Sequence, residues 1–482
     1  MRSRTLIGAG AGVLLALAAV APVAAQPDEM LFEVASSGEL ELAGQTRLSI
    51  EGIRGTVFIR AGKAGELRYS AATRAARREP HDVAFWLRGG TMIFRPVEGR
   101  EADELILEIA VSEGVRLNIE KTGGKVQVAS VLADVSVNAV DAEVDIRGAG
   151  EGVDVRLERG SLRLENLNGP TTAVGTSVAS TLLSRLNGRT QLTMTESPVE
   201  ASSLGGMLEI DLERSTLDVQ SSSGQVSGSA IGARVGLTDV RGGGELELEE
   251  SPLQLTRCRG DFKIDTDAGV NFAALGGTLE VTGFGGSIVG DGHSGAVTVE
   301  NRDADVKLTN ISGLLSLKGA ALRVELAEIG GRVNAELADS QVTAEKMRGG
   351  FEVTNEFGDV SVVGVEGPTK IVSRNGSVVA LDLAGTVEIE AEGPEVRVAW
   401  REVGRDQDSR IENAGGDVFV DFPIGGGARV DAEAESIETD LEAVRVEEGG
   451  RRAQGIVGEV DKPAVTIKAA GRLVLTRGAG AQ

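Results

Sequence analysis

The sequence is poor in the residues on which catalysis and cofactor binding most often depend. Its 482 residues include one cysteine, Cys258, two histidines and one tyrosine, and aromatic residues make up 3% of the chain. A single cysteine excludes an internal disulfide, and two histidines cannot form a zinc site by themselves. The formal net charge is −24. That charge excludes nucleic acid as a partner, because binding it requires Lys and Arg to neutralise phosphates.

A long apolar run occurs once, at residues 6–21, and the glycines within it keep it short. Arg2 and Arg4 precede the run, and small residues before Gln26 suit a cleavage site. This pattern predicts a signal peptide over residues 1–25. An N-terminal membrane anchor is the alternative, although a span needs about 20 apolar residues. We therefore expect an exported protein in the periplasm, on the outer-membrane surface or secreted, with no transmembrane segment after signal removal.

Glycine is abundant, with 66 residues, and much of it is periodic. A glycine followed by paired apolar residues returns about every 18 residues, and thirteen such intervals cover 233 residues. Self-similarity at a fixed period indicates a repeat fold in which each repeat stacks on its neighbours. The glycines of this series are Gly152, Gly169, Gly188, Gly206, Gly224, Gly243, Gly260, Gly277, Gly295, Gly313, Gly331, Gly350, Gly367 and Gly385.

The coil from Gly206 to Gly224 shows the pattern that the others repeat. Leu208-Glu-Ile210 is followed by a polar corner and then by Leu217-Asp-Val219. Apolar residues two apart are typical of strands with one buried face, so each coil should hold two short strands. A hexapeptide helix needs an aliphatic residue every six positions and is disfavoured, because the aliphatic pairs here return about every nine. A calcium-binding nonapeptide roll needs Gly-Gly-x-Gly-x-Asp turns, whereas Gly276-Gly277 is followed by an apolar strand. The predicted fold is all-β: a single-chain, β-helix-like β-solenoid with ~18-residue coils, capped at both ends by irregular β segments.

The repeat is interrupted at both ends of the mature chain. Caps are expected there, because an open coil exposes a strand edge that can template aggregation. Longer apolar strands out of the 18-residue register predict an N-terminal β cap over 26–125, ahead of solenoid repeats over 126–400. A C-terminal β cap with closing strands is predicted over 401–482. It begins with a polar stretch that we interpret as a loop between Trp400 and Ile411.

Two stretches show the order of strands and turns of a known family. Residues 105–128 read as an apolar strand, a glycine turn, a second strand and a first Gly-x-Val-x-Val coil, and residues 455–475 hold the closing strands. They resemble the beginning and the end of the bacterial putative-adhesin domain, a β-strand repeat family of unknown function. Residues 112–114 lack its usual proline, and its Gly-Asp pair persists at Gly260-Asp261 and Gly358-Asp359. The resemblance implies a β-solenoid and an adhesive role, and it brings no catalytic residues.

Few side chains are candidates for a site. Cys258 lies two residues before Gly260, a position that Leu or Ile fills in other coils, so we interpret it as a buried thiol rather than a reactive nucleophile. His293 holds the same position in its coil. Asp291 and His293 are the one candidate pair of metal ligands, and an irregular turn is the alternative interpretation. Residues assigned a structural role are Gly206, Gly260, Gly277, Gly313, Gly331 and Cys258.

Two functions from different classes remain. The first is an exported, non-catalytic structural or adhesive protein of the cell envelope. Its repetitive surface would bind a protein, the envelope or another copy, with no cofactor unless Ca²⁺ bridges carboxylates. The second is a polysaccharide-active β-helix enzyme, a lyase or hydrolase, with outward carboxylates such as Glu300 and Glu325 as acid and base. No nucleophile elbow or phosphate-binding loop is present, and we predict no catalytic residues, because coils of uniform length leave no place for a pocket.

Overall fold

The computed structural model describes residues 30–35, 37–42, 46–73, 83–88, 90–96, 105–405, 407–458 and 463–478, so the predicted signal peptide lies outside the described residues. Every helix or strand in these ranges is a β-strand, which confirms the predicted all-β solenoid. The chain divides into two compact units. Unit 1 comprises Met1–Val235 with Val240–Gly242, and unit 2 comprises Gly236–Asp239 with Gly243–Gln482.

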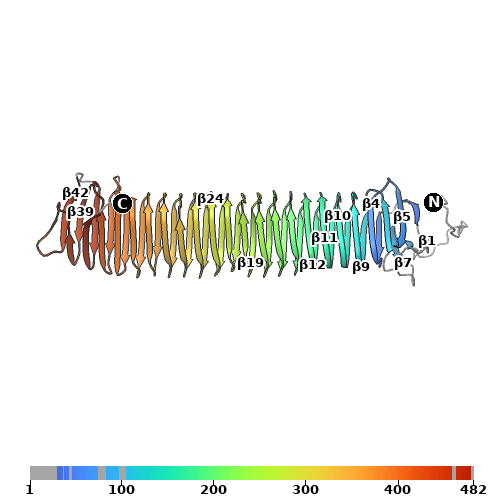
Figure 1. The fold of residues 1–482 in the computed structure, drawn as a ribbon, viewed down its shortest axis with the longest axis horizontal. Coiled ribbons are helices and arrows are strands. Elements are labelled where there is room, and N and C mark those ends of the chain that lie inside the picture. Colours follow the sequence, from blue (N-terminus) through green and yellow to red (C-terminus); the bar gives the residue numbers. More distant parts are fainter. Residues whose placement is uncertain are drawn as a thin grey trace. The chain divides into compact units, whose positions relative to one another are not determined.

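In unit 1, four long strands each cover both halves of one coil (Figure 1). They are β9 (Arg116–Ala129), β10 (Val135–Arg147), β11 (Val153–Leu167) and β12 (Thr171–Leu186). Neighbours pair in parallel about one period apart, as at Val135↔Leu117 and Val135↔Val153. After β12 each coil holds two separate strands: β13 (Thr190–Thr195), β14 (Pro198–Ser202), β15 (Leu208–Glu213), β16 (Thr216–Gln220), β17 (Val226–Ile231) and β18 (Arg234–Thr238), the last of which contains the unit boundary.

In unit 2, each regular coil contributes one strand to each of two parallel sheets. The odd sheet contains β19 (Gly244–Glu249), β21 (Phe262–Thr266), β23 (Leu279–Phe284), β25 (Val297–Arg302), β27 (Leu315–Ala320), β29 (Val333–Ala338), β31 (Phe351–Asn355), β33 (Thr369–Arg374) and β35 (Val387–Glu392). The even sheet contains β20 (Leu253–Thr256), β22 (Val270–Leu275), β24 (Ser287–His293), β26 (Asp305–Ile311), β28 (Arg323–Ala327), β30 (Gln341–Met347), β32 (Val360–Val365), β34 (Val378–Gly385) and β36 (Glu395–Val403).

Alternation along each strand separates the core from the surface. In β27, Leu315 and Leu317 are 0% and 1% exposed, whereas Ser316 and Lys318 point outward. Because successive side chains leave a strand on opposite faces, a period of two residues suffices to fill a narrow aliphatic interior. Each fully buried aliphatic side chain stabilises the stack by about 1.5–3 kcal/mol.

The N-terminal end of unit 1 does not follow chain order. Strands β3 (Arg47–Glu51) and β4 (Gly55–Ala61) pair in parallel with the two halves of β9 and so form the coil that precedes it. On their other side lie β7 (Thr91–Pro96) and β8 (Leu105–Val111), also in parallel. The predicted boundary between residues 125 and 126 falls inside β9. Antiparallel strands cover the outer edge: β6 (Val83–Arg88), then β1 (Met30–Ala35), on β7, and β5 (Glu66–Thr73), then β2 (Ser37–Glu41), on β8.

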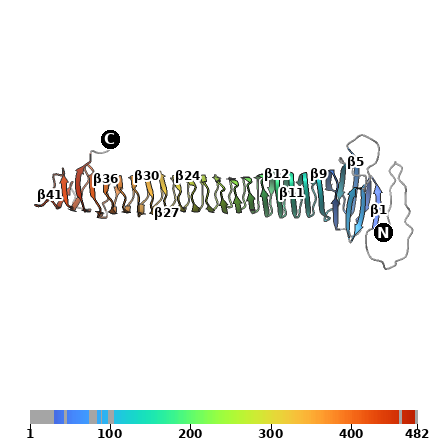
Figure 2. The same ribbon diagram turned by 90° about the horizontal axis from the view of Figure 1, so that it is seen from below.

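The C-terminal end of unit 2 lies beyond β36, where Figure 2 labels β41. Its strands, too, do not follow chain order. The loop expected between Trp400 and Ile411 is shorter than predicted, because β36 continues to Val403 and β37 begins at Ser409. The last two strands of the chain lie inside the stack: β43 pairs with β37 and β39, and β44 pairs with β38 and β40. The strands of this end are β37 (Ser409–Asn413), β38 (Asp417–Phe422), β39 (Ala428–Glu433), β40 (Ser436–Thr439), β41 (Val444–Val446), β42 (Arg452–Val457), β43 (Ala464–Ala469) and β44 (Arg472–Arg477).

The periodic glycines stack on one another within each unit. In unit 1, a Cβ atom on Gly206 would overlap the carbonyl oxygen of Gly188, and one on Gly224 would overlap that of Gly206. Only glycine fits such a close approach of two backbones. In unit 2 the same overlap, with the carbonyl group of the glycine one coil earlier, would occur at Gly277, which stacks on Gly260, and at Gly295, Gly313 and Gly331.

At two coils the stack passes through the neighbour of the glycine that the sequence series selects. Gly242, not Gly243, contacts Gly224, and Gly349, not Gly350, contacts Gly331. Gly242 is the first of three consecutive glycines, and Gly349 is the first of two. The sequence alone cannot tell which glycine of such a run lies against the previous coil.

Lys121 of β9 is an ionisable residue in the core of unit 1. It is 4% exposed, and its Nζ donates a hydrogen bond to the carbonyl oxygen of Ile53 at 3.0 Å. Burial lowers the pKa of Lys121 from 10.5 to about 8. A depressed lysine pKa means that the unfolded chain binds more protons between pH 8 and 10.5, so unit 1 gains stability as the pH rises through that window.

We expect Lys121→Met to stabilise unit 1 by about 2 kcal/mol at pH 7, because the cost of burying the charge is removed and one hydrogen bond is lost. Urea unfolding at pH 7 and at pH 10.5 measures the effect, and the gain should disappear at the higher pH. Lys125→Met in the same strand is the control, since its ammonium is paired with Glu143 at the surface. An equal gain for both variants would contradict a burial cost at Lys121.

Candidate functional site

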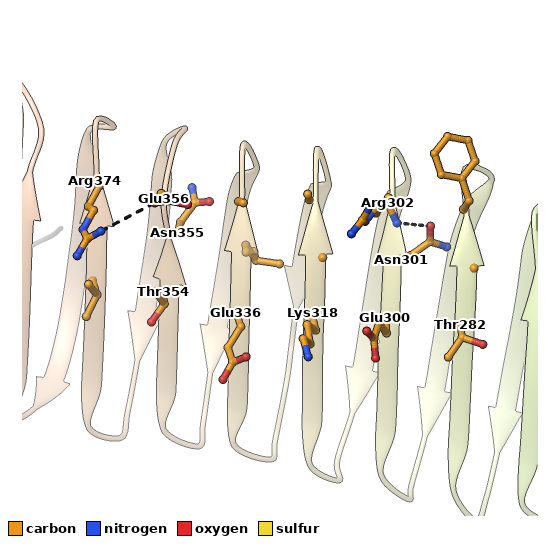
Figure 3. Close-up of a pocket in the computed structure, with 17 residues that line it drawn as sticks. Thr282, Glu300, Asn301, Arg302, Lys318, Glu336, Thr354, Asn355, Glu356 and Arg374 are labelled. Atoms are coloured by element: carbon orange, nitrogen blue, oxygen red, sulfur yellow. Dashed lines mark hydrogen bonds and ion pairs between the residues drawn. The ribbon is translucent and has the colours of Figure 1, made fainter.

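A shallow groove crosses the outer surface of the odd sheet in unit 2 (Figure 3). It runs over β23, β25, β27, β29, β31 and β33 and follows two rows of side chains. The groove is an open depression over coils of uniform length, not an enclosed pocket. Its residues are Thr282, Gly283, Phe284, Glu300, Asn301, Arg302, Lys318, Gly319, Ala320, Glu336, Leu337, Ala338, Thr354, Asn355, Glu356, Val372 and Arg374.

The central row of the groove consists of side chains that stack one coil above another. Figure 3 shows Thr282, Glu300, Lys318, Glu336 and Thr354 side by side on neighbouring strands. Parallel pairing fixes this register from β23 to β31 and extends it to Val372 of β33. Adjacent members of the row are therefore about 4.8 Å apart.

The second row, which we term the corner row, lies two residues further along each strand. Its members are Phe284, Arg302, Ala320, Ala338, Glu356 and Arg374. Phe284 is 60% exposed at one end of this row. The smallest side chains of the corner row are those of Ala320 and Ala338, which lie between the charged Arg302 and Glu356.

Charges in the middle of the groove lack the pairing that holds charges elsewhere in unit 2. Lys307 forms an ion pair with Glu325 at 2.9 Å, and Lys346 forms one with Glu328 at 2.9 Å; the partners in each pair are 18 residues apart. The Lys346 ammonium lowers the pKa of Glu328 through its hydrogen bond. Within the described ranges, the side chains of Glu300, Arg302, Lys318 and Glu336 form no ion pair. Arg374 contacts Glu356 at 3.9 Å at the far end.

Two residues beneath the groove, Asn301 of β25 and Asn355 of β31, turn their amide side chains inward. Asn301 is 2% exposed and Asn355 is 1% exposed. Asn301 Oδ1 accepts a hydrogen bond from the Arg302 amide, and Asn355 Nδ2 donates to the carbonyl oxygens of Ser340 and Gly358. The other end of each amide, Asn301 Nδ2 and Asn355 Oδ1, has no partner among the described residues. These two amides lie in the core beneath the groove, so the polar groups of the groove surface come from its outward residues.

The structure does not bring the predicted metal ligands together. Asp291 and His293 leave β24 on opposite faces: Asp291 is exposed, whereas His293 is 2% exposed in the core. Asp291 Oδ1 accepts a hydrogen bond from Asn310 Nδ2 at 2.7 Å, and His293 Nε2 donates one to the carbonyl oxygen of Ala296 at 3.2 Å. Across the part of the chain that the structure describes, no three His, Cys, Asp or Glu side chains gather as a metal site requires.

His293 makes the stability of unit 2 depend on pH. Burial lowers the pKa of His293 below its ordinary value of 6.5, and Nδ1 has no partner among the described residues. The unfolded chain therefore takes up a proton before the folded one does as the pH falls. The stability contribution is fully present above pH 6.5 and is lost as the pH falls below it.

We expect His293→Ile to flatten this part of the pH dependence, because Ile311 already fills the paired position in β26. Urea unfolding midpoints between pH 5.5 and 7.5 measure the effect; the interval brackets the unperturbed histidine pKa of about 6.5. His81→Gln is the matched control, since His81 is the other histidine of the chain. If the urea midpoint of the His293→Ile variant decreased below pH 6.5 as much as that of the natural chain does, the assignment would be contradicted.

The other singled-out residues serve the packing of unit 2. Cys258 is fully buried, with Sγ near the carbonyl oxygens of Leu237 and Thr256. Gly260, Gly277, Gly313 and Gly331 belong to the glycine stack described above, as Gly206 does in unit 1. None of these residues lines the groove.

Sequence reasoning identified Glu300 but missed Lys318, Glu336, Asn301 and Asn355. A signal for the first two exists, since the three charged residues are spaced 18 apart and alternate in sign. Asn301 and Asn355 occupy inward positions, where the sequence pattern leads one to expect an apolar residue. Their part in the groove follows only from the stacking of the coils.

Comparisons with known proteins add little to this geometry. No protein-family model matches the sequence, and no curated protein matches it. The resemblance to bacterial putative adhesins therefore gains no support from a sequence match. Among solved structures, the chain is similar to a putative cell adhesion protein from Clostridium sporogenes, with 7% identity over 94% of this chain and 100% of that chain and a TM-score of 0.14. A likeness at this level carries no argument about function.

Among the residues that the structure describes, no helix is long and apolar enough to cross a bilayer.

Proposed function

We propose that the protein is exported and acts, without catalysis, as a structural or adhesive protein of the cell envelope. The observation that carries the proposal is the repetition of outward side chains at one fixed register from coil to coil, as in the central row of the groove. A contact made by one coil can be repeated by the next, so weak contacts add up over a surface. The apolar run of residues 6–21 supports export.

The proposal predicts where the protein is found in the cell and what releases it. Fractionation of native cells should place the mature chain with the envelope or on the cell surface, and washing with salt or with a chelator should release it if charges or bridging Ca²⁺ hold it there. A chain found entirely as free soluble protein, unaffected by either wash, would count against an adhesive role.

A second candidate rests on the carboxylates of the groove. Glu300 and Glu336 lie two coils apart, about 9.6 Å along the stack. This spacing is close to that of the carboxyl pairs of inverting glycosidases. Incubation with acidic polysaccharides tests the alternative: new chain ends formed by the natural protein but not by a Glu300→Gln/Glu336→Gln variant would establish an enzyme. No turnover by either protein agrees with the non-catalytic proposal.

A further inference from the structure

We propose that the groove of unit 2 binds the groove of a second copy of this chain, with the two copies antiparallel. The two-fold axis lies along the strand direction, midway between the coil of Lys318 and the coil of Glu336. The inference does not depend on the proposed function, since it concerns purified protein in solution. It rests on the order of charges along the groove.

The axis places opposite charges against each other in the central row. It sets Lys318 against the partner copy's Glu336, and by symmetry Glu336 against the partner copy's Lys318. Both side chains are exposed and, among the described residues, form no ion pair within their own chain. Glu300 faces Thr354 in the same arrangement, so no like charges meet in this row.

The corner row matches about the same axis. Arg302 faces Glu356 of the other copy, and the small Ala320 faces Ala338, which allows the two surfaces to approach closely. At the ends of the row, the exposed ring of Phe284 faces the guanidinium group of Arg374, a geometry that suits a cation–π contact. One axis therefore satisfies both rows of the groove.

A third row, two residues before the central row, is also complementary. Glu280 faces Lys370 and Ser316 faces Asn334 about the same axis. Beyond the groove, the central row would bring like charges together. One coil out, Asp265 faces Glu390 of the other copy, and two coils out, Glu247 faces Glu412. These like charges confine the contact to the six coils of the groove.

The spacing of the charges favours another copy over other ligands. In the central row, Glu300, Lys318 and Glu336 alternate in sign from one coil to the next, about 4.8 Å apart, whereas side chains on one face of an extended peptide repeat every 6.6–6.8 Å. A second solenoid has the same coil spacing and stays in register along the whole groove. A sugar chain would find few aromatic rings to stack on, because Phe284 is the one aromatic residue that lines the groove in the described part of the chain.

The contact is small. Six coils span about 24 Å along the stack, and the three rows span about 13 Å along the strands. Such a patch lies at the weak, transient end of protein interfaces. We therefore expect a dimer that forms at high protein concentration, dissociates as salt is added, and gains strength only where many copies are held close together.

Charge reversal tests this geometry with the full mature chain. Lys318→Glu alone places two like-charged pairs in the interface, and Glu336→Lys alone does the same. We expect each variant to dimerise at least about tenfold more weakly than the natural chain, a loss of about 1.4 kcal/mol or more. An equimolar mixture of the two variants should dimerise about as well as the natural chain, because every pair is again of opposite sign. Sedimentation velocity over a concentration series at low salt measures the dimerisation of the natural chain, of each variant and of the mixture.

The controls separate the interface from folding and from general charge effects. Both substituted side chains are exposed, so the variants should unfold at the temperature of the natural chain. Lys307→Glu and Glu325→Lys reverse a pair of the same spacing on the even sheet, and dimerisation should not change. A natural chain that stays monomeric at every concentration would overturn the proposal, as would a mixture that does not regain dimerisation. Binding of a polysaccharide to the groove without dimerisation would also overturn it.

Discussion

Gly331→Ala should unfold the middle of unit 2, whereas Gly330→Ala one residue earlier should be nearly silent. A Cβ atom at Gly331 would overlap the carbonyl oxygen of Gly313, which belongs to a backbone that cannot move without disturbing the coil. A Cβ atom at Gly330 would lie 3.4 Å from its nearest neighbour, Ser312 Cα, which is an ordinary contact. We expect Gly331→Ala to lower the free energy of unfolding by at least about 4 kcal/mol, in the range of the largest single-residue effects.

The pair is closely matched, because both changes add one methyl group to the same turn of the same coil. Urea unfolding followed by circular dichroism gives the free energies. Hydrogen exchange should locate the loss in the coils on either side of Gly331. Equal stability of the two variants would show that the glycine stack does not fix the separation of the coils.

Ending the chain at residue 462 should detach the C-terminal end of unit 2, although it removes only the last two strands. Val465, Ile467, Leu473 and Leu475 on these strands are each 0% exposed. Their burial contributes roughly 6–12 kcal/mol in total. Because β43 and β44 lie between β37/β38 and β39/β40, their loss also exposes the edges of the strands that they separate.

Limited proteolysis measures this effect. In the chain that ends at residue 462, the segment 428–457 should become cleavable, and the protein should aggregate at lower concentration than the natural chain. A chain that ends at Gly478 keeps every described strand and serves as the control. If the segment 428–457 stayed protected in the shorter chain, β39–β42 would hold to the stack without β43 and β44.

The coil itself could be predicted because its physics is local. The period of 18, the apolar pairs such as Leu315 and Leu317, and the corners between them all follow from neighbouring residues. The reason for the glycines was not visible in the sequence. It lies in the carbonyl group one coil away, as between Gly331 and Gly313.

The ends and the groove depend on contacts between distant segments. Ile411 pairs with Ile467 across 56 residues, and Leu48 pairs with Leu117 across 69, so the order of coils at each end cannot be inferred from the repeat. The groove depends on which residue of each coil stacks on which, and the intervals between the periodic glycines vary from 17 to 19 residues. A shift of one residue would turn Lys318 into the core and Leu317 out of it.

The distance between outward positions of the central row tests coil-by-coil stacking most directly. In a Cys258→Ala background, nitroxide labels would be placed at Thr282 and at one further position of the row, with the labelled protein diluted in unlabelled protein to suppress signals between copies. Pulsed electron spin resonance should then give separations of about 14, 19, 24 and 29 Å, a steady increase of about 4.8 Å per coil, for second labels at Glu336, Thr354, Val372 and Glu390 respectively. Distances that do not rise in equal steps would show that these residues are not stacked in register, and with that the glycine stack, the groove and the antiparallel dimer would all be wrong.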